Sequence, residues 1–280
     1  MVNAKKTNAI PDEQFAQNFR SLAAQIKTLS RQLRPFEGAD VVSLLRTGGL
    51  ASGSARHHWT TRAGTKRFLE AWTWSALIST VFRFPFTIFG KEGQGANNLW
   101  MSLFHTNQHS GWPCPSLSSE TWRQATMEQL VSLVDQDIVT KGKEKANYLW
   151  LEDHLVVARA EIADYIASGL SVITPTVDRA QVRQIIDKSF TLAMQMALQR
   201  PRLQVTFPRV GAEINSGQMS FDGEEEEEGP EDGIVAVVVN PGLTKWGDAH
   251  GEKYDHRYDI VRALVQFEKP AEGMYGVSLI

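Results

Sequence analysis

The spacing of apolar residues in the first 200 positions is the feature that most constrains the fold, because it has the period of an α-helix. The spacing is clearest after Pro11, which has no backbone N–H to leave unbonded at a helix start, and the acidic Asp12 and Glu13 suit the positive end of the helix. Apolar side chains then step by 4, 3, 4, 3 and 4 residues until Arg34-Pro35 stops the helix. They are Phe15, Phe19, Leu22, Ile26, Leu29 and Leu33.

This apolar seam has two possible roles. It can be an interface that pairs with another chain, which would make the protein a homo-oligomer, or it can be the first helix of the chain's own core. Fewer than three heptads is short for an independent coiled coil, and the two phenylalanines at its start are unusual for a dimeric zipper. The sequence therefore favours packing within one chain.

Similar spacing predicts further helices over about 39–46, 63–82, 97–104, 118–138, 148–169 and 176–200. The glycine-rich run from Gly90 to Gly95 superficially resembles a phosphate-binding loop. It lacks the Lys-Ser/Thr ending of a P-loop and carries Glu92 where phosphate would sit. We interpret it as a plain flexible loop.

After Pro201 the helical periodicity gives way to short β-like runs over 203–207, 234–239 and 261–267. Between the first two lies an acidic loop, 222–232, whose five consecutive glutamates repel one another. The predicted fold class is therefore α+β, mainly α, with a bundle-like helical body (1–200) and a small β-containing C-terminal segment (201–280). The tail is small for a core of its own, so we expect it to pack on the body as one domain.

Composition indicates a globular protein of a reducing compartment. Hydrophobic residues make up 42% of the chain, and the single cysteine, Cys114, cannot form an intramolecular disulfide. The N-terminus lacks the apolar core of a signal peptide. The apolar run 71–89 is cut by Arg83 and Pro85 before it reaches the ~20 residues of a membrane span. We expect an intracellular protein, cytoplasmic or nuclear, without a membrane span.

Charge is distributed unevenly, since residues 1–110 hold 13 Lys and Arg against 6 Asp and Glu. The most basic window also contains an aromatic residue, a mixture used for phosphate contact and base stacking. It consists of Arg56, His57, His58, Trp59, Arg62, Lys66 and Arg67. The competing interpretation is a solvated helix start whose cations pair with the acidic C-terminal part. The isoelectric point of 6.2 favours this second interpretation over a nucleic-acid surface.

The C-terminal segment contains the densest group of potential acid–base residues and metal ligands. They are Asp248, His250, Glu252, Asp255, His256 and Asp259. A polar, glycine-containing turn has the same composition, and no nucleophile or glycine cradle accompanies the group, so the solvated turn is favoured. A second group, His105, His109 and Cys114, offers only three ligands and is interpreted as a surface loop. The sequence predicts no metal and no cofactor.

Two stretches resemble those of uncharacterised proteins from filamentous ascomycete fungi. They are the run 111–115 with Glu120-Thr121-Trp122-Arg123, and the run 240–252. The resemblance extends from about Arg34 to the C-terminus. It implies a fungal origin and a cytosolic or nuclear location, and it supplies no catalytic residues.

The absence of a nucleophile–base pair, a cofactor loop or a strong metal motif favours a non-enzymatic protein. Amphipathic helices, clustered tryptophans and a charged loop are compatible with a protein–protein interaction or regulatory module whose partner is a protein. One alternative is a nucleic-acid-binding protein that uses the window 56–67. Another is a hydrolase or metal-dependent enzyme that uses the cluster 248–259.

Overall fold

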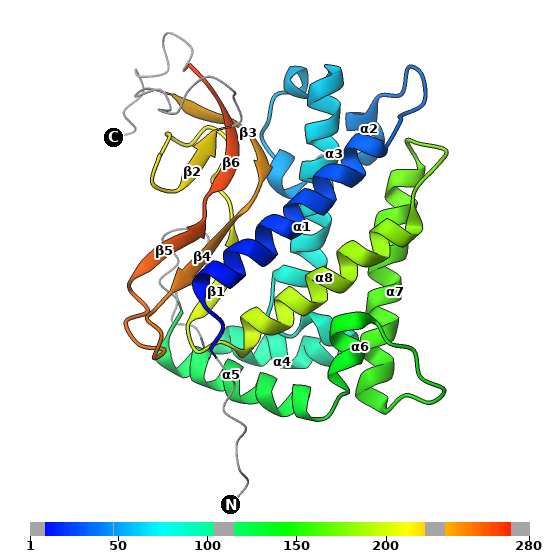
Figure 1. The fold of residues 1–280 in the computed structure, drawn as a ribbon. Helices are drawn as coiled ribbons and strands as arrows, with labels where there is room; N and C mark the ends of the chain where they lie inside the picture. Colours follow the sequence, from blue (N-terminus) through cyan, green and yellow to red (C-terminus); the bar gives the residue numbers. More distant parts are fainter. Residues whose placement is uncertain (1–8, 47, 104–114, 222–232, 270–280) are drawn as a thin grey trace, which may run out of the picture.

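The computed structural model describes residues 9–46, 48–103, 115–221 and 233–269 (Figure 1). These residues form eight α-helices and two three-stranded sheets, which confirms the predicted fold class, α+β and mainly α. Among them, no helix is long and apolar enough to cross a membrane. The predicted acidic loop 222–232 and the group His105, His109 and Cys114 lie outside the described residues.

The helices follow the predicted order along the chain. They are α1 (Asp12–Gln32), α2 (Val41–Leu45), α3 (Arg62–Leu77), α4 (Gly90–Ser102), α5 (Leu117–Ser132), α6 (Gln136–Lys141), α7 (Trp150–Ser171) and α8 (Arg179–Leu198). Three short 3-10 helices, η1 (Gly49–Ala51), η2 (Arg56–Trp59) and η4 (Thr87–Phe89), and one π-helix, η3 (Ile78–Phe82), complete the helical part.

Polar side chains set several helix starts by accepting the hydrogen bonds of free backbone N–H groups. Thr61 accepts from the amide of Gly64 at the start of α3, and Asp178 accepts from two amides at the start of α8. Ser116 and Ser119 bond each other's backbone amides in a reciprocal box at the start of α5. At the other end, Gly142 closes α6 with φ +61°, a conformation that glycine adopts without steric cost.

The prediction of a loop over Gly90–Gly95 is wrong, because these residues form the first turns of α4. Gly93 serves close packing there rather than flexibility. A Cβ on Gly93 would lie 1.8 Å from the carbonyl oxygen of Phe86, and the Asn97 side chain accepts a hydrogen bond from the Phe86 amide at 3.0 Å. A second difference is that the single helix expected over 118–138 is divided into α5 and α6 by a turn at Asp135, whose side chain caps α6.

The strands form one long bent ribbon with an extra strand at each end. They are β1 (Arg202–Thr206), β2 (Met219–Phe221), β3 (Ile234–Asn240), β4 (Gly242–Trp246), β5 (Arg257–Val261) and β6 (Ala263–Glu268). β3 and β4 run on through Pro241, and β5 and β6 run on through Arg262, so that β3 pairs with β6 and β4 with β5, both antiparallel. β1 lies antiparallel beside β4, whereas β2 lies parallel beside β6.

Helix α1 lies between the strands and the other helices (Figure 1). All six residues of its apolar seam are at most 5% exposed, and Phe19 stacks on Trp74 of α3 with ring centroids 5.1 Å apart. The seam is therefore core of this chain, as the favoured interpretation expected. The seam is not available for pairing with another chain, because α3 and α8 of the same chain already cover it.

Polar contacts from β3 and β4 help to join the strands to the helices. Trp74 Nε1 donates to Asn240 Oδ1 at 2.5 Å, and Asn240 Nδ2 donates to Glu70 Oε1 at 2.8 Å, which ties α3 to the end of β3. Lys245 of β4 donates to Asp12 at the start of α1 at 2.8 Å. Burial alone would lower the pKa of Lys245, but its hydrogen bonds to Asp12 and Tyr258 outweigh that effect and raise it.

A buried arginine joins α5 to the end of α8 and the start of β1. Arg123 Nε donates to Glu120 Oε2 at 2.6 Å, and both side chains are fully buried. The remaining guanidinium nitrogens donate to the carbonyl oxygens of Ala197 and, at 2.6 Å, Gln199. These carbonyls belong to the last turn and C-cap of α8, where no backbone partner is left for them.

We predict that Ile26→Asp lowers the free energy of unfolding by about 4 kcal/mol or more, because it places an unpaired charge in the core. Urea denaturation measures the loss. The matched control is Ala24→Asp on the exposed face of α1, with an expected change within about 0.5 kcal/mol. A folded Ile26→Asp variant with half the native mass in light scattering would show instead that the seam joins two chains.

We predict that Arg123→Met costs about 3–5 kcal/mol, because it leaves Glu120 charged, buried and unpaired. The double variant Glu120→Gln, Arg123→Met should lose less than the sum of the two single changes, since the stranded charge is gone. Urea denaturation of wild type, the two single variants and the double variant gives the four free energies of unfolding of this double-mutant cycle. Strict additivity would contradict a direct coupling between the two side chains.

Candidate functional site

A groove of about 660 Å³ lies between α1, α3 and the strands, and its lining is strongly basic. We call it the basic groove. Its cationic residues are Lys27 and Arg31 of α1 and Arg62, Lys66 and Arg67 of α3. Ser30, Ala63, Glu70, Val239 and Leu264 complete its lining.

Helix periodicity explains why these cations gather in one place. Lys27 and Arg31 are four residues apart on α1, and Arg62 and Lys66 are four apart on α3, so each pair lies on one side of its helix. The two helices are held against each other by apolar packing, of which the Phe19–Trp74 stack is a part. Core packing thus brings the two cationic stripes to the same groove.

Four of the five cations of the basic groove lack a carboxylate partner in the described part of the chain. Among the described residues, no carboxylate forms an ion pair with Lys27, Arg31, Arg62 or Lys66. The acidic residue of the lining, Glu70, is 4% exposed and accepts the hydrogen bond from Asn240.

The N-terminus of α3 adds to the positive electrostatic potential of the basic groove, since α3 begins at Arg62 and no acidic side chain lies in its first turn. The free backbone amides and the helix dipole there favour negative charge. The basic groove is therefore suited to an anionic ligand.

The structure divides the basic window that the sequence singled out. Arg62, Lys66 and Arg67 line the groove, whereas Arg56 forms an ion pair with Asp40. Trp59 is 1% exposed and packs edge-on against Phe68, so in this structure it is not exposed for the base stacking that the nucleic-acid alternative considered. Its place in the core follows from the apolar surface that an indole ring buries.

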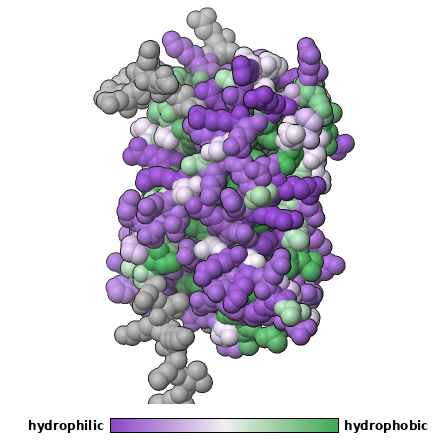
Figure 2. Space-filling view, turned by 45° about the vertical axis from the view of Figure 1, so that its right-hand side comes forward, coloured by the Kyte–Doolittle hydropathy of each residue, from purple (hydrophilic) through white to green (hydrophobic). Residues whose placement is uncertain are grey.

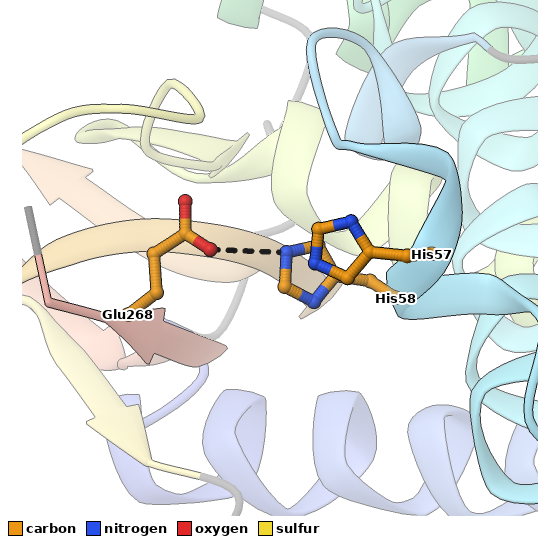
Figure 3. Close-up of side chains that lie close together, drawn as sticks. All are labelled: His57, His58 and Glu268. Carbon is orange, nitrogen blue, oxygen red and sulfur yellow. Dashed lines mark ion pairs between the residues drawn. The ribbon is translucent and has the colours of Figure 1, made fainter. Parts of the chain in front are cut away.

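His57 and His58 of η2 come together with Glu268, the last residue of β6 (Figure 3). The Nε2 atom of His58 lies 3.2 Å from Oε2 of Glu268, and the two imidazole rings are 4.1 Å apart. One ligand atom from each of the three side chains lies within 4.8 Å of the others, the one such group among the described residues. Two imidazoles and a carboxylate form a donor set that zinc and similar ions accept.

Sequence reasoning did not find this His57–His58–Glu268 group. The sequence presents the two histidines as possible contacts for nucleic acid and gives no signal for Glu268. No local pattern relates them, because 210 positions separate His58 from Glu268 and only the pairing of β6 brings the carboxylate to η2. Within the fold, the His58–Glu268 ion pair fastens the end of β6 to the helical part.

The predicted acid–base cluster of the C-terminal segment does not converge. Asp248 accepts hydrogen bonds from the backbone amides of Glu252 and His250, and the bond from Glu252 is the main cause of its lowered pKa. His256 and Asp255 lie 3.7 Å apart with both side chains largely exposed. In the described part of the chain these residues form no common site with Asp248, because its carboxylate is used to close a turn.

Comparison with family models, with curated proteins and with solved structures gave no match to this chain. The resemblance to fungal proteins stays a prediction.

We predict that a chelator leaves the melting temperature unchanged, because the His57–His58–Glu268 group lies outside the apolar core that determines stability. Differential scanning calorimetry with and without chelator measures this, beside metal analysis of the untreated protein. A drop in melting temperature that is absent in His57→Ala, with about one zinc per untreated chain, would make this group a structural metal site.

Proposed function

We propose that this protein binds single-stranded nucleic acid in the basic groove, through the phosphate backbone and without sequence preference. The observation that supports the proposal is the convergence of five cationic side chains from α1 and α3 on one recess at a helix N-terminus. Phosphates are the anions that such an arrangement of lysines, arginines and free amides binds best. This is the nucleic-acid alternative of the sequence analysis, reduced to Arg62, Lys66 and Arg67 of the window 56–67 and extended by the two α1 cations.

The shape and composition of the groove favour a single strand. A recess of about 660 Å³ admits one or two nucleotides, whereas a duplex would rest on its rim. Its apolar lining residues, Val239 and Leu264, offer no edge for hydrogen bonding to bases. Because Trp59 is in the core, the described window also lacks an aromatic stacking platform. Binding is then dominated by phosphate contacts, which carry no sequence information.

The other functions predicted from the sequence have less geometric support. The enzymatic alternative requires the residues of 248–259 to converge, but the close pair Asp255 and His256 is largely exposed, and Asp248 is engaged in a turn. The protein–protein interaction module stays a prediction. Figure 2 shows one face that is mostly hydrophilic, with hydrophobic side chains in small separate patches, and interface anchors are normally clustered.

The test is fluorescence anisotropy of a labelled oligothymidylate, titrated with the protein at several salt concentrations. We expect the double variant Lys27→Gln, Lys66→Gln to bind more weakly than wild type. Loss of two phosphate contacts should also reduce the slope of log K against log salt concentration by about 1.4, since each contact on a single strand contributes roughly 0.7. Labelled oligonucleotides of other sequences should bind with similar affinity.

The matched control is Lys91→Gln, Lys141→Gln, which removes the same charge from exposed lysines outside the groove. It should retain the wild-type slope. An equal loss in both double variants would show that binding depends on net charge alone. Absence of binding by wild type at low salt, or preferential binding to anionic lipid vesicles, would also overturn the proposal.

A further inference from the structure

A second cavity, of about 750 Å³, lies against the C-terminal half of α3. The α3 residues that line it are Trp72, Ser75 and Ala76, and at about 100° of rotation per residue this set lies on the other side of the helix from the set that lines the basic groove. The two cavities are therefore separate. This one has aromatic walls, formed by Trp72, Phe84, Trp100, Tyr165 and Phe207.

The aromatic walls are held in place by the surrounding fold. Trp72 and Tyr165 pack with ring centroids 6.3 Å apart. Trp72 also fits against Gly169 of α7 so closely that a Cβ there would lie 2.5 Å from the indole ring. A volume of 750 Å³ is typical of pockets that enclose small organic molecules, whose flat rings stack against such walls.

Arg202 of β1 gives the cavity a buried positive charge. The side chain is 6% exposed, and its guanidinium carbon lies 4.6 Å from the centroid of the Trp100 ring. Burial lowers the pKa of Arg202 to about 10, so the group is still charged at neutral pH. Within the described part of the chain, the guanidinium has no hydrogen bond and no ion pair.

The neighbouring buried charges do not neutralise Arg202. Glu120 attracts it over a longer range, but that carboxylate is already bound by Arg123 at 2.6 Å. One buried carboxylate thus faces two buried guanidiniums. An uncompensated buried cation costs free energy, which a bound anion would offset.

The entrance to the cavity has the same charge. Arg46 and Arg83 are exposed lining residues, and neither has an ion-pair partner among the described residues. Gln204, 5% exposed, contributes a polar amide to the lining. Among the described residues that line the cavity, none is acidic.

We propose that this cavity binds a planar organic anion, whose flat apolar body lies between the aromatic side chains and whose carboxylate or phosphate group pairs with Arg202. Such a molecule satisfies both features of the site, the aromatic walls and the unpaired guanidinium. The site is independent of the basic groove and of the function proposed for it.

Isothermal titration calorimetry with three naphthalene probes tests the proposal. We expect 2-naphthoate and 2-naphthyl phosphate to bind one per chain, each at least about tenfold tighter than neutral 2-naphthalenemethanol. The tighter of the two anions indicates whether the natural ligand is a carboxylate or a phosphate. Arg202→Met should abolish the preference for anions, and Arg83→Gln, at the rim, should weaken both anions about threefold or more.

A steric variant tests the location without changing any charge. Ser79 is an exposed lining residue, so Ser79→Phe should block all three probes while Ser79→Ala should not. Circular dichroism establishes that the variants are folded, and if Arg202→Met is not, Arg83→Gln and Ser79→Phe decide. Anion binding that persists in Ser79→Phe, or a wild type without preference for anions, would overturn the proposal. The variant Lys27→Gln, Lys66→Gln should bind the naphthalene anions normally, which separates this test from that of the nucleic-acid proposal.

Discussion

The buried guanidinium of Arg123 is the contact on which the arrangement of the C-terminal half depends. It binds Glu120 within α5 and the carbonyl oxygens that α8 leaves free at its end. The chain turns there from helix into β1, so one side chain determines where the strands begin relative to two helices. Glu120 forms its ion pair with Arg123. The charge of Arg202, at the start of β1, is therefore not balanced by a nearby carboxylate. The contact that organises the fold thus also creates the electrostatic character of the aromatic cavity.

Helix α3 is the element that both proposed sites share. Its N-terminal half contributes Arg62 and Lys66 to the basic groove, and its C-terminal half contributes Trp72 to the aromatic cavity. In the C-terminal half, Trp74 also packs on Phe19 and donates to Asn240, which fixes the rotation of the helix about its axis. The rotation decides which side chains enter each cavity. The same buried contacts that stabilise the fold therefore position two different sets of polar residues.

The candidate sites could be predicted from the sequence only in part. Arg62, Lys66 and Arg67 stood out because they form a dense local run of cations. Lys27 and Arg31 carried no comparable signal, since cations at this spacing are ordinary on the exposed side of any amphipathic helix. Arg202 was missed because an arginine beside a proline at the start of a strand has no distinctive pattern. Its burial and its lack of a partner are properties of the surroundings.

What the sequence determined by itself was local: the period of the apolar residues, the helix starts and stops, and the change from helical periodicity to short β-like runs after Pro201. These signals established a mainly helical α+β protein and six residues of its core. Tertiary structure alone decided that Gly90–Gly95 is helical, that Trp59 is in the core, and that Glu268 reaches His58. Each depends on contacts between segments far apart in the chain. Backbone preferences act over a few residues, whereas burial and ion pairing depend on which elements the whole core brings together.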